Sequence, residues 1–510
     1  MLTFCLAIMP EAAWASNVGD GLVIGIQSTK TLTIRPFEPV ERDVLSIYHV
    51  VYESLVTIDD NYLPQPCLAE SWTESSSGKV WTFHLRQDVH FSDGTPLTAA
   101  DVVASAQYIL ELAQDENIAD HGFYANLNYF VSSISAEDDY TVVVRSNKRK
   151  YFGLLYEMTF PIVPASLVRA DNPPGTGPYL IADFKAGDYL WLQANTSWWQ
   201  AQPQVREIMF SMHDTPKGVT ESYEYARVDT IFTRSIAGAQ YKSGTSALSI
   251  SYRTHQLECL MMNNASSELT LEVRRAIRYV IDRSQIISNV YMGLAQLTNF
   301  PFFPGTWMYN DSLDSLFTRN LEEARRLLEE AGWGDSDENG ILDRYKDDGT
   351  LSNLHLRFFV YEEPDNDVRV EAANMIAEQL SQVGISCTVD SMTMAGLQER
   401  LSAGSFDLAL VSFAMDVCPD PGFILMRGNS GNYNRYKSEK MTGLCEELRT
   451  EVNQEGFRQK LMEIQALFAE DCPFLCLYYR MGTVVTRYMY TAARDVREYE
   501  LLRGIETFHP

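Results

Sequence analysis

A single acidic residue, Asp416, follows the apolar segment Phe406 to Phe413 in the sequence FDLALVSFAMDVCPDP. A carboxylate at this position could cap a turn, form half of a catalytic pair, hold a metal ion or anchor a charged ligand. A carboxylate that meets a cation forms a charge-assisted hydrogen bond, which is roughly twice as strong as a neutral one. The segment itself leaves all four roles open, so the neighbouring elements must decide among them.

The sequence lacks the motifs of common enzymes and metal sites. It contains no H-E-x-x-H, G-x-S-x-G or P-loop pattern, and its eight histidines are scattered. The segment DSDENGILD, which begins at Asp335, resembles the start of a calcium-binding loop, but Lys346 stands where that loop needs a bidentate glutamate. We therefore expect a polar turn here, and no catalytic residue, bound metal or cofactor in the protein.

The elements around Asp416 alternate between strands and helices. Their expected ranges are a strand Leu354–Val360, a helix Val368–Val383, a strand Ile385–Met392, a short helix Leu397–Leu401 and a strand Phe406–Phe413. This order predicts a mostly parallel sheet with helical crossovers, and ligands of such sheets bind beyond the carboxyl ends of the strands. Asp416 follows such an end, which favours a role in binding. A cap for the turn before Pro419 remains the structural alternative.

Length and charge limit the class of protein. A chain of 510 residues is too long for one hydrophobic core, because cores stop growing at roughly 250 to 300 residues, so we expect two or three domains. The sequence has no apolar run of about 18 residues that could span a membrane. Its formal net charge of -27 argues against nucleic acid or an anionic membrane surface as a partner.

The first fifteen residues, MLTFCLAIMPEAAWA, look like the end of a secretory signal peptide. Small residues at Ala13 and Ala15 match a cleavage site, whereas no basic residue precedes the apolar stretch. We therefore expect a truncated signal peptide and an exported protein. Cys5 lacks the small preceding residue of a lipid-anchor signal, and we expect the other seven cysteines to be ordinary buried thiols.

Six motifs occur in an order that is typical of one family. They are YESLV at Tyr52, LAESW at Leu68, WTFHLRQDVHFSDGTPLTAADVV at Trp81, GTGPY at Gly175, VRRAIRYVIDRSQIISNVYMGLA at Val273 and EARRLLEEAGW at Glu323. In these motifs and their order, the chain resembles the extracellular solute-binding proteins of ABC importers, in family 5, whose members bind dipeptides, oligopeptides or nickel. Each motif also has a physical reason, such as turn glycines, the Thr98–Asp101 capping box and the apolar helix face that begins at Val273.

The resemblance implies an α/β fold of the periplasmic-binding-protein-like type II, with two lobes, an extra domain, mixed sheets and a hinge-bending cleft. Residues 1–15 would be the signal peptide. The first lobe would combine residues 16–50, 175–258 and 477–510, with residues 51–174 as its accessory domain. Residues 259–476 would form the second lobe.

The resemblance also implies a ligand site. Peptide-binding members carry an aspartate in a W-x-x-D pattern that pairs with the N-terminal ammonium of the peptide. In this sequence Phe413 takes the place of the tryptophan and Asp416 that of the acid, with Met415 beside it. The phenylalanine keeps an aromatic wall but loses the indole N–H. Val40 is a further candidate, for a backbone contact from the first lobe.

Three functions remain open at this stage. The first is an exported, monomeric receptor, periplasmic or attached to the cell surface, that captures peptides and delivers them to the permease subunits of an ABC transporter. The second is a receptor of the same fold for another solute, such as a nickel complex or an oligosaccharide. The third is an exported enzyme, which the absence of a nucleophile–base pair or metal set disfavours.

Overall fold

The computed structural model describes residues 21–28, 33–38, 41–115, 123–147, 152–243, 248–346, 348–364, 366–488 and 496–507. The proposed signal peptide and Val40 lie outside the described residues. Among the described residues, no helix combines the length and the apolar character that crossing a membrane requires.

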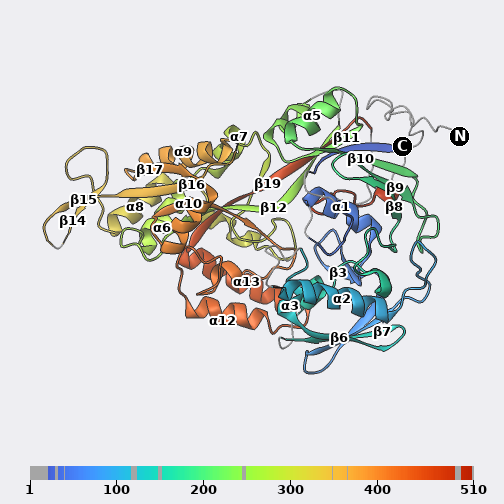
Figure 1. Cartoon of the computed structure of the whole chain (residues 1–510). Coiled ribbons are helices and arrows are strands. Elements are labelled where there is room, and N and C mark those ends of the chain that lie inside the picture. Colours follow the sequence, from blue (N-terminus) through green and yellow to red (C-terminus); the bar gives the residue numbers. More distant parts are fainter. Residues whose placement is uncertain are drawn as a thin grey trace. The chain divides into compact units, whose positions relative to one another are not determined.

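The chain divides into two compact units, which we describe separately. Unit 1 comprises Met1–Lys150, Leu154–Tyr252 and Gly482–Pro510, and unit 2 comprises Tyr151–Gly153 and Arg253–Met481. The chain passes from unit 1 to unit 2 within the long strand β12 (Leu248–Met262) and returns within β19 (Phe474–Thr486), drawn in green and red in Figure 1. The sequence-based boundaries at residues 258 and 476 fall within the same two strands. The division into three domains stays a prediction.

Unit 1 contains a mixed sheet with the strand order β19-β11-β1-β10-β9-β8. The strands are β1 (Leu22–Gln27), β8 (Tyr179–Lys185), β9 (Tyr189–Ala194), β10 (Glu207–His213) and β11 (Thr230–Thr233). Strand β1 pairs in parallel with β10 and β11, whereas β11 pairs antiparallel with the returning end of β19. Helix α5 (Pro216–Glu224) contributes Val219 and Tyr223 to a buried cluster with Val23 and Ile231 of the sheet.

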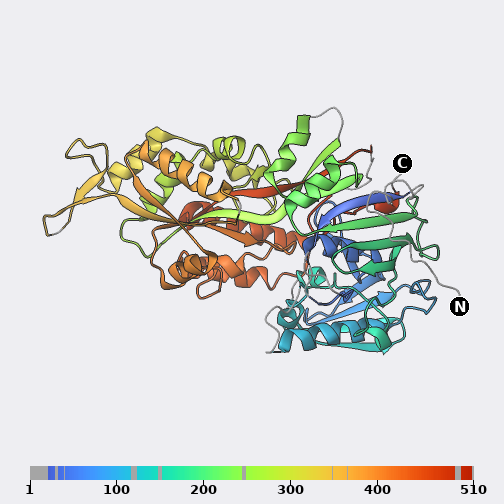
Figure 2. The same ribbon diagram turned by 45° about the horizontal axis from the view of Figure 1, so that its top comes forward.

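A second sheet of unit 1 has the order β4-β5-β7-β6. Its strands are β4 (Ala69–Glu74), β5 (Val80–Leu85), β6 (Val131–Asp138) and β7 (Thr141–Ser146), and helix α2 (Ala99–Gln114) runs along it in Figures 1 and 2. The predicted alternation in β5 is confirmed, because Trp81, Phe83 and Leu85 are buried. The predicted capping box is also confirmed: the Asp101 carboxylate accepts hydrogen bonds of 2.8 Å from both the backbone N–H and the hydroxyl of Thr98.

Shorter elements complete unit 1. They are α1 (Arg42–Val51), β2 (Val56–Ile58), β3 (Pro64–Pro66), α3 (Leu127–Phe130) and α4 (Leu154–Glu157). The motif GTGPY packs against the end of α1, where a Cβ atom at Gly175 would lie 2.0 Å from the carbonyl oxygen of Val51. At Gly177 the corresponding distance, to the carbonyl oxygen of Val50, would be 2.5 Å. Both glycines are therefore required by close backbone approach.

Unit 2 contains the predicted strand–helix–strand–helix–strand segment. Its elements are β16 (His355–Tyr361), α9 (Val368–Ser381), β17 (Ser386–Met392), α10 (Met394–Ala403) and β18 (Leu408–Ala414). Strand β16 pairs in parallel with both β17 and β18, which confirms the parallel sheet expected from the sequence. Strand β18 then pairs antiparallel with β12, and β12 neighbours β19.

The helices of unit 2 bury the faces that the sequence pattern indicates. They are α6 (Leu271–Val280), α7 (Arg283–Asn289), α8 (Leu321–Glu330), α11 (Gly422–Leu425), α12 (Glu439–Leu448) and α13 (Gln454–Asp471), with the short strands β13 (Ala295–Leu297), β14 (Asp343–Tyr345) and β15 (Leu351–Asn353). Val273, Ala276, Ile277 and Val280 of α6 are fully buried. Helices α12 and α13 lie side by side in Figure 1.

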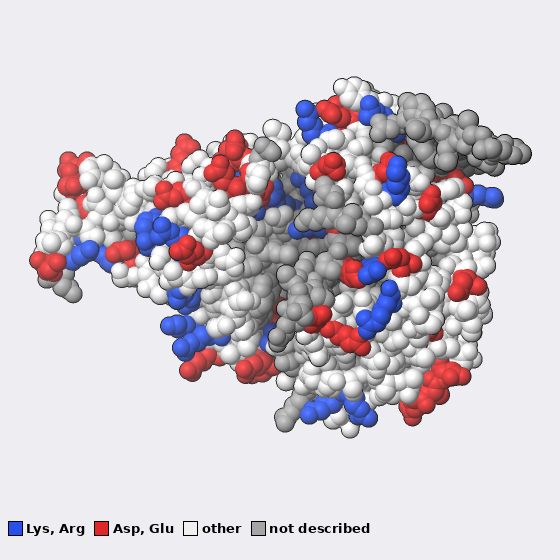
Figure 3. Space-filling view, viewed as in Figure 1, with Lys and Arg blue, Asp and Glu red and all other residues white. Residues whose placement is uncertain are grey.

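Acidic and basic side chains are mixed on the surface of the described residues. On the face drawn in Figure 3, Lys and Arg side chains are interspersed with Asp and Glu, so the acidic excess there is spread over the surface.

The seven described cysteines are free thiols, of which five are buried and Cys67 and Cys387 are half-buried. The expectation of buried thiols therefore agrees with the structure for five cysteines and not for Cys67 and Cys387.

Candidate functional site

The carboxyl ends of the parallel strands in unit 2 form the edge where we expect ligand. Because β16, β17 and β18 run in the same direction, the residues after Tyr361, Met392 and Ala414 emerge on one edge of the sheet. Asp416 is the second residue after β18. The strands therefore put an acidic side chain on the edge that open α/β sheets use for binding.

Asp416 itself is exposed, and its carboxylate takes part in a turn. Its Oδ1 atom accepts a 3.2 Å hydrogen bond from the backbone N–H of Cys418. This is the capping role that the sequence left open as the structural alternative. A carboxylate has two oxygens and can accept several hydrogen bonds. Ligand binding by Asp416 stays a prediction.

The residues beside Asp416 are mostly buried. Phe413 is 8% exposed and lies in an aromatic cluster, stacked on Tyr433 with ring centroids 6.3 Å apart and edge-on to Phe423 at 5.9 Å. Met415 is 7% exposed, and its backbone N–H donates to the carbonyl oxygen of His255 on β12. Phe413 therefore supports the turn through packing, and contact of either side chain with ligand stays a prediction.

A buried cluster of charges, which the sequence analysis missed, lies at the same end of β16. We call it the ion cluster, and it consists of Glu258 on β12, Glu363 after β16, Arg369 in the first turn of α9 and Arg480 on β19. Arg369 Nη2 lies 2.8 Å from Glu258 Oε1 and 3.0 Å from Glu363 Oε1. Arg480 Nη1 lies 3.0 Å from that same Glu363 oxygen. Glu258, Arg480 and the segment that holds both Glu363 and Arg369 are far apart in sequence, so no local pattern could have indicated the cluster.

Burial makes the ion cluster sensitive to the loss of any member. Glu258 is fully buried and Arg369 is 4% exposed. Burial acts to lower the pKa of Arg369, but the carboxylates of Glu258 and Glu363 outweigh it and hold the pKa above its usual value. Within the described residues, Glu258 Oε2 and Arg369 Nε have no hydrogen-bond partner. Such buried polar atoms are expected to bind water or a ligand group.

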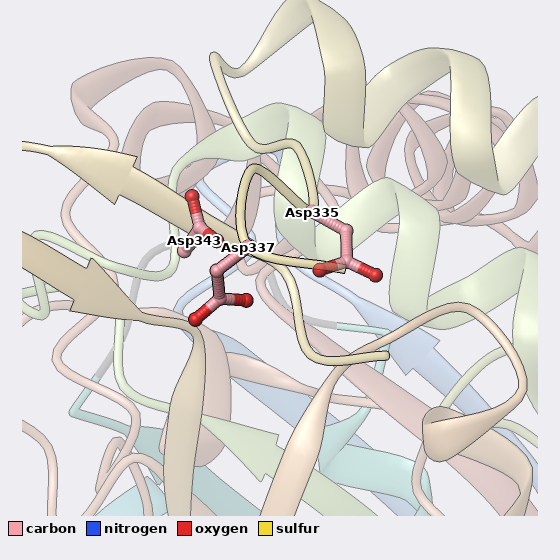
Figure 4. Close-up of side chains that lie close together, drawn as sticks. All are labelled: Asp335, Asp337 and Asp343. Atoms are coloured by element: carbon pink, nitrogen blue, oxygen red, sulfur yellow. The ribbon is translucent and has the colours of Figure 1, made fainter. Parts of the chain in front are cut away.

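The acidic loop that begins at Asp335 folds back on itself. Figure 4 shows Asp335, Asp337 and Asp343, which each place one oxygen within 4.8 Å of the others. These oxygens accept hydrogen bonds from the loop: Asp335 from the N–H groups of Asn339 and Gly340, and Asp343 from Ser336. The loop therefore has the geometry of the polar turn that the sequence predicts.

Two of the shared motifs meet inside unit 1, around Glu53 of YESLV. Its two carboxylate oxygens accept hydrogen bonds from the indole N–H groups of Trp198, at 3.1 Å, and Trp199, at 2.8 Å. Burial raises the pKa of Glu53 to about 7, although the two indole donors favour its ionised form. Arg86, from the motif that begins at Trp81, stacks on Trp199 with its guanidinium carbon 4.6 Å from the ring centroid. The sequence analysis used these motifs for recognition and assigned no role to Glu53 or Arg86.

Comparison with known proteins shows the family. The model of the bacterial extracellular solute-binding proteins, family 5 Middle, matches residues 64–435. The oligopeptide-binding protein AppA of Bacillus subtilis is 24% identical over 519 residues, which cover 96% of this chain and 92% of AppA. The nickel-binding periplasmic protein of Escherichia coli is 26% identical over 301 residues, 56% of each chain.

A solved structure shows the same fold. HbpA2 from Haemophilus parasuis superposes with a TM-score of 0.80 at 22% identity, covering 95% of this chain and 99% of HbpA2. The parallel strands of unit 2, the mixed sheet of unit 1 and the six motifs in their order agree with the family match. The chain belongs to the bacterial extracellular solute-binding proteins of family 5.

Proposed function

We propose that the protein is an exported, monomeric receptor that binds peptides and delivers them to the permease of an ABC importer. Its family consists of binding proteins rather than enzymes, and the Bacillus subtilis relative binds oligopeptides. The observation that carries the peptide assignment is the exposed carboxylate of Asp416, two residues beyond the carboxyl end of β18. In this proposal the carboxylate pairs with the ammonium at the N-terminus of a peptide.

The physical basis is the change in the surroundings of Asp416 on binding. A ligand that covers the carboxylate removes its water, and this desolvation is unfavourable unless a cation takes the place of the water. A peptide ammonium supplies both a charge and N–H donors. Peptide backbone can then pair in the manner of an added strand, which binds main chain without reading side chains.

The competing function is a receptor for a nickel complex, since the Escherichia coli relative binds nickel. Thermal-shift measurements across a peptide library, nickel chelates and oligosaccharides separate the two. Stabilisation by peptides alone is the expected result. Stabilisation by nickel chelates with no response to any peptide would overturn the peptide assignment and leave the family assignment intact.

The anchor role of Asp416 is tested by a cycle of two proteins and two peptides, measured by calorimetry at fixed salt. Asp416→Asn is expected to weaken binding of a free peptide by about 1.5 to 3 kcal/mol, the range for hydrogen bonds to charged groups. N-acetylation removes the ammonium charge and is expected to weaken binding to the unsubstituted protein by about a hundredfold or more, which is about 2.8 kcal/mol. The variant lacks the carboxylate that pairs with the ammonium, so N-acetylation is expected to weaken its peptide binding by a smaller factor.

Asp348→Asn provides the matched control. Asp348 is an exposed residue of unit 2 whose carboxylate caps a turn through the N–H of Thr350, two residues on, as Asp416 does with Cys418. This control is expected to bind both peptides as the unsubstituted protein does. A coupling energy of zero between Asp416→Asn and acetylation would show that Asp416 only caps its turn.

A further inference from the structure

Unit 1 contains a cavity of about 410 Å³, and all of the residues that line it belong to unit 1. Several distant segments line it: the end of α1 with β2, Pro66 and Cys67, Arg86, Thr159, Pro178, the turn at Trp198–Gln200, and residues between Glu500 and Glu506. Sites for small organic ligands span about 300 to 1,000 Å³. The cavity is therefore large enough for a compact organic molecule.

Arg86, a charged residue of the cavity wall, has N–H donors that can serve a ligand. Arg86 donates from Nε to the carbonyl oxygen of Cys67 at 2.7 Å and stacks on Trp199. Its Nη1 and Nη2 atoms make no hydrogen bond or ion pair with another described residue. A guanidinium held flat against a ring presents its remaining N–H groups as a rigid fork, which fits a carboxylate.

The other charged residues of the cavity wall either form ion pairs within the protein or are acidic. Arg503 forms ion pairs with Asp60, at 2.8 Å, and with Glu500. Glu53 accepts the two indole N–H groups, and Glu506 adds a further acid to the wall. Three carboxyl groups against two guanidinium groups disfavour a multiply charged anion such as phosphate, because like charges repel at short range in a cavity.

The rest of the wall is mixed, with serine, threonine and glutamine side chains beside apolar ones. Its apolar part consists of aliphatic side chains and the two indole rings, namely Val50, Val56, Ile58, Leu502, Trp198 and Trp199. From this combination we infer that the cavity binds a small monocarboxylate with an apolar body, the carboxylate pairing with Arg86 and the body packing against Trp198 and Trp199. This site is independent of the peptide site proposed for unit 2.

The geometry predicts that binding depends on the protonation of Glu53. An anion beside Arg86 meets the Glu53 carboxyl group, which is neutral below a pKa of about 7 and negatively charged above it. The other titratable groups around the cavity are Cys67 and Tyr52, whose pKa values burial raises, His49, whose pKa burial lowers, and Glu500, Arg503 and Glu506. Glu53 is therefore the group that changes charge near neutral pH, so the monocarboxylate should bind more tightly at pH 6 than at pH 8.

The test uses the full-length protein with benzoate, and with benzamide as an uncharged molecule of the same shape. We expect calorimetry and tryptophan fluorescence to show benzoate binding at least about tenfold more tightly than benzamide at pH 6, because only the carboxylate pairs with Arg86. We expect benzoate affinity to fall at least about fivefold from pH 6 to pH 8, and Glu53→Gln to remove this dependence. Equal affinities for the two molecules in the unsubstituted protein would overturn the inference without any variant.

Two arginine variants locate the site. Arg86→Gln is expected to lower benzoate affinity to that of benzamide. The matched control is Arg169→Gln, since Arg169 also stacks on a ring of unit 1, 4.5 Å from the centroid of Tyr108, but lies outside the cavity wall. It is expected to bind benzoate normally. If Arg86→Gln remains folded by circular dichroism and keeps full benzoate affinity, Arg86 is not the partner and the inference is wrong.

Discussion

Among single residues, Glu53 is a buried acid whose protonation burial changes. It is 9% exposed, and both of its oxygens face indole N–H groups. Burial, the largest cause, raises its pKa from 4.5 to about 7. Between these values the unfolded chain loses the proton while the folded protein keeps it. The folded state then binds more protons, so its stability falls as the pH rises from 4.5 to 7.

Glu53→Gln is expected to remove this loss of stability. The free energy of unfolding of the variant, minus that of the unsubstituted protein, should rise by about 3 kcal/mol between pH 4.5 and pH 8, since each pKa unit corresponds to about 1.4 kcal/mol. Urea denaturation at a series of pH values measures the difference. Glu111→Gln, an exposed glutamate on α2, serves as the control and should show no comparable trend. A difference that is independent of pH would contradict the assignment.

At the scale of secondary-structure elements, the start of α2 depends on one carboxylate. Asp101 accepts two bonds from Thr98, and its Oδ1 atom accepts a third, of 2.8 Å, from the backbone N–H of Ala165. The first two bonds begin the helix, and the third ties it to the segment that follows α4. Capping boxes satisfy N–H groups that the first turn of a helix would otherwise leave unpaired.

Asp101→Ala is expected to destabilise the protein by about 2 to 3 kcal/mol, because it removes a cap and a bond to a charged group. Chemical denaturation followed by circular dichroism measures the change. Asp88→Ala, which alters an exposed aspartate of the same motif, is expected to change stability by less than about 0.5 kcal/mol. Equal effects of the two substitutions would show that the capping box contributes nothing specific.

In the whole molecule, the two units differ in whether they are continuous in sequence. Unit 2 is continuous apart from three residues, whereas unit 1 takes residues from both sides of it. Unit 1 needs the end of β19, since β11 pairs with Thr483–Thr486. It also needs Arg497, whose guanidinium donates to the carbonyl oxygens of Ile58 and Asp59. Unit 1 therefore cannot be completed until the chain has passed through unit 2.

Dissection of the chain tests this dependence. A fragment of residues 253–481 is expected to fold cooperatively, because its sheet and helices belong to unit 2. A fragment of residues 1–252 is expected to remain largely unfolded, because β11 loses its partner strand and β2 loses Arg497. Thermal melts and the spread of amide resonances in NMR spectra distinguish the two outcomes. A cooperative melt of the N-terminal fragment would refute the argument.

Local patterns in the sequence were enough to predict the secondary-structure elements and the family. The alternation in β5, the Thr98–Asp101 capping box and the parallel strands around Asp416 depend on residues that are close in sequence. Such features depend on backbone geometry and on the periods of helix and strand, which a single segment specifies by itself. The order of the six motifs indicated the family. The position of Asp416 after β18 indicated a candidate anchor for the ligand.

Which distant residues share a site depends on the packing of the whole chain. Arg369 and Glu258 are separated by 111 positions, and Glu53 and Trp199 by 146, so no periodicity relates them. The tertiary structure also showed Phe413 packed against Tyr433 and Asp416 bonded to the turn at Cys418, details that the segment could not specify. Burial and partner choice depend on how the whole chain packs, because desolvation and ion pairing are determined by every group that surrounds a charge. Local sequence patterns therefore indicate the family, the elements and the candidate anchor Asp416, whereas the ion cluster and the cavity around Glu53 and Arg86 follow from the packing of the whole chain.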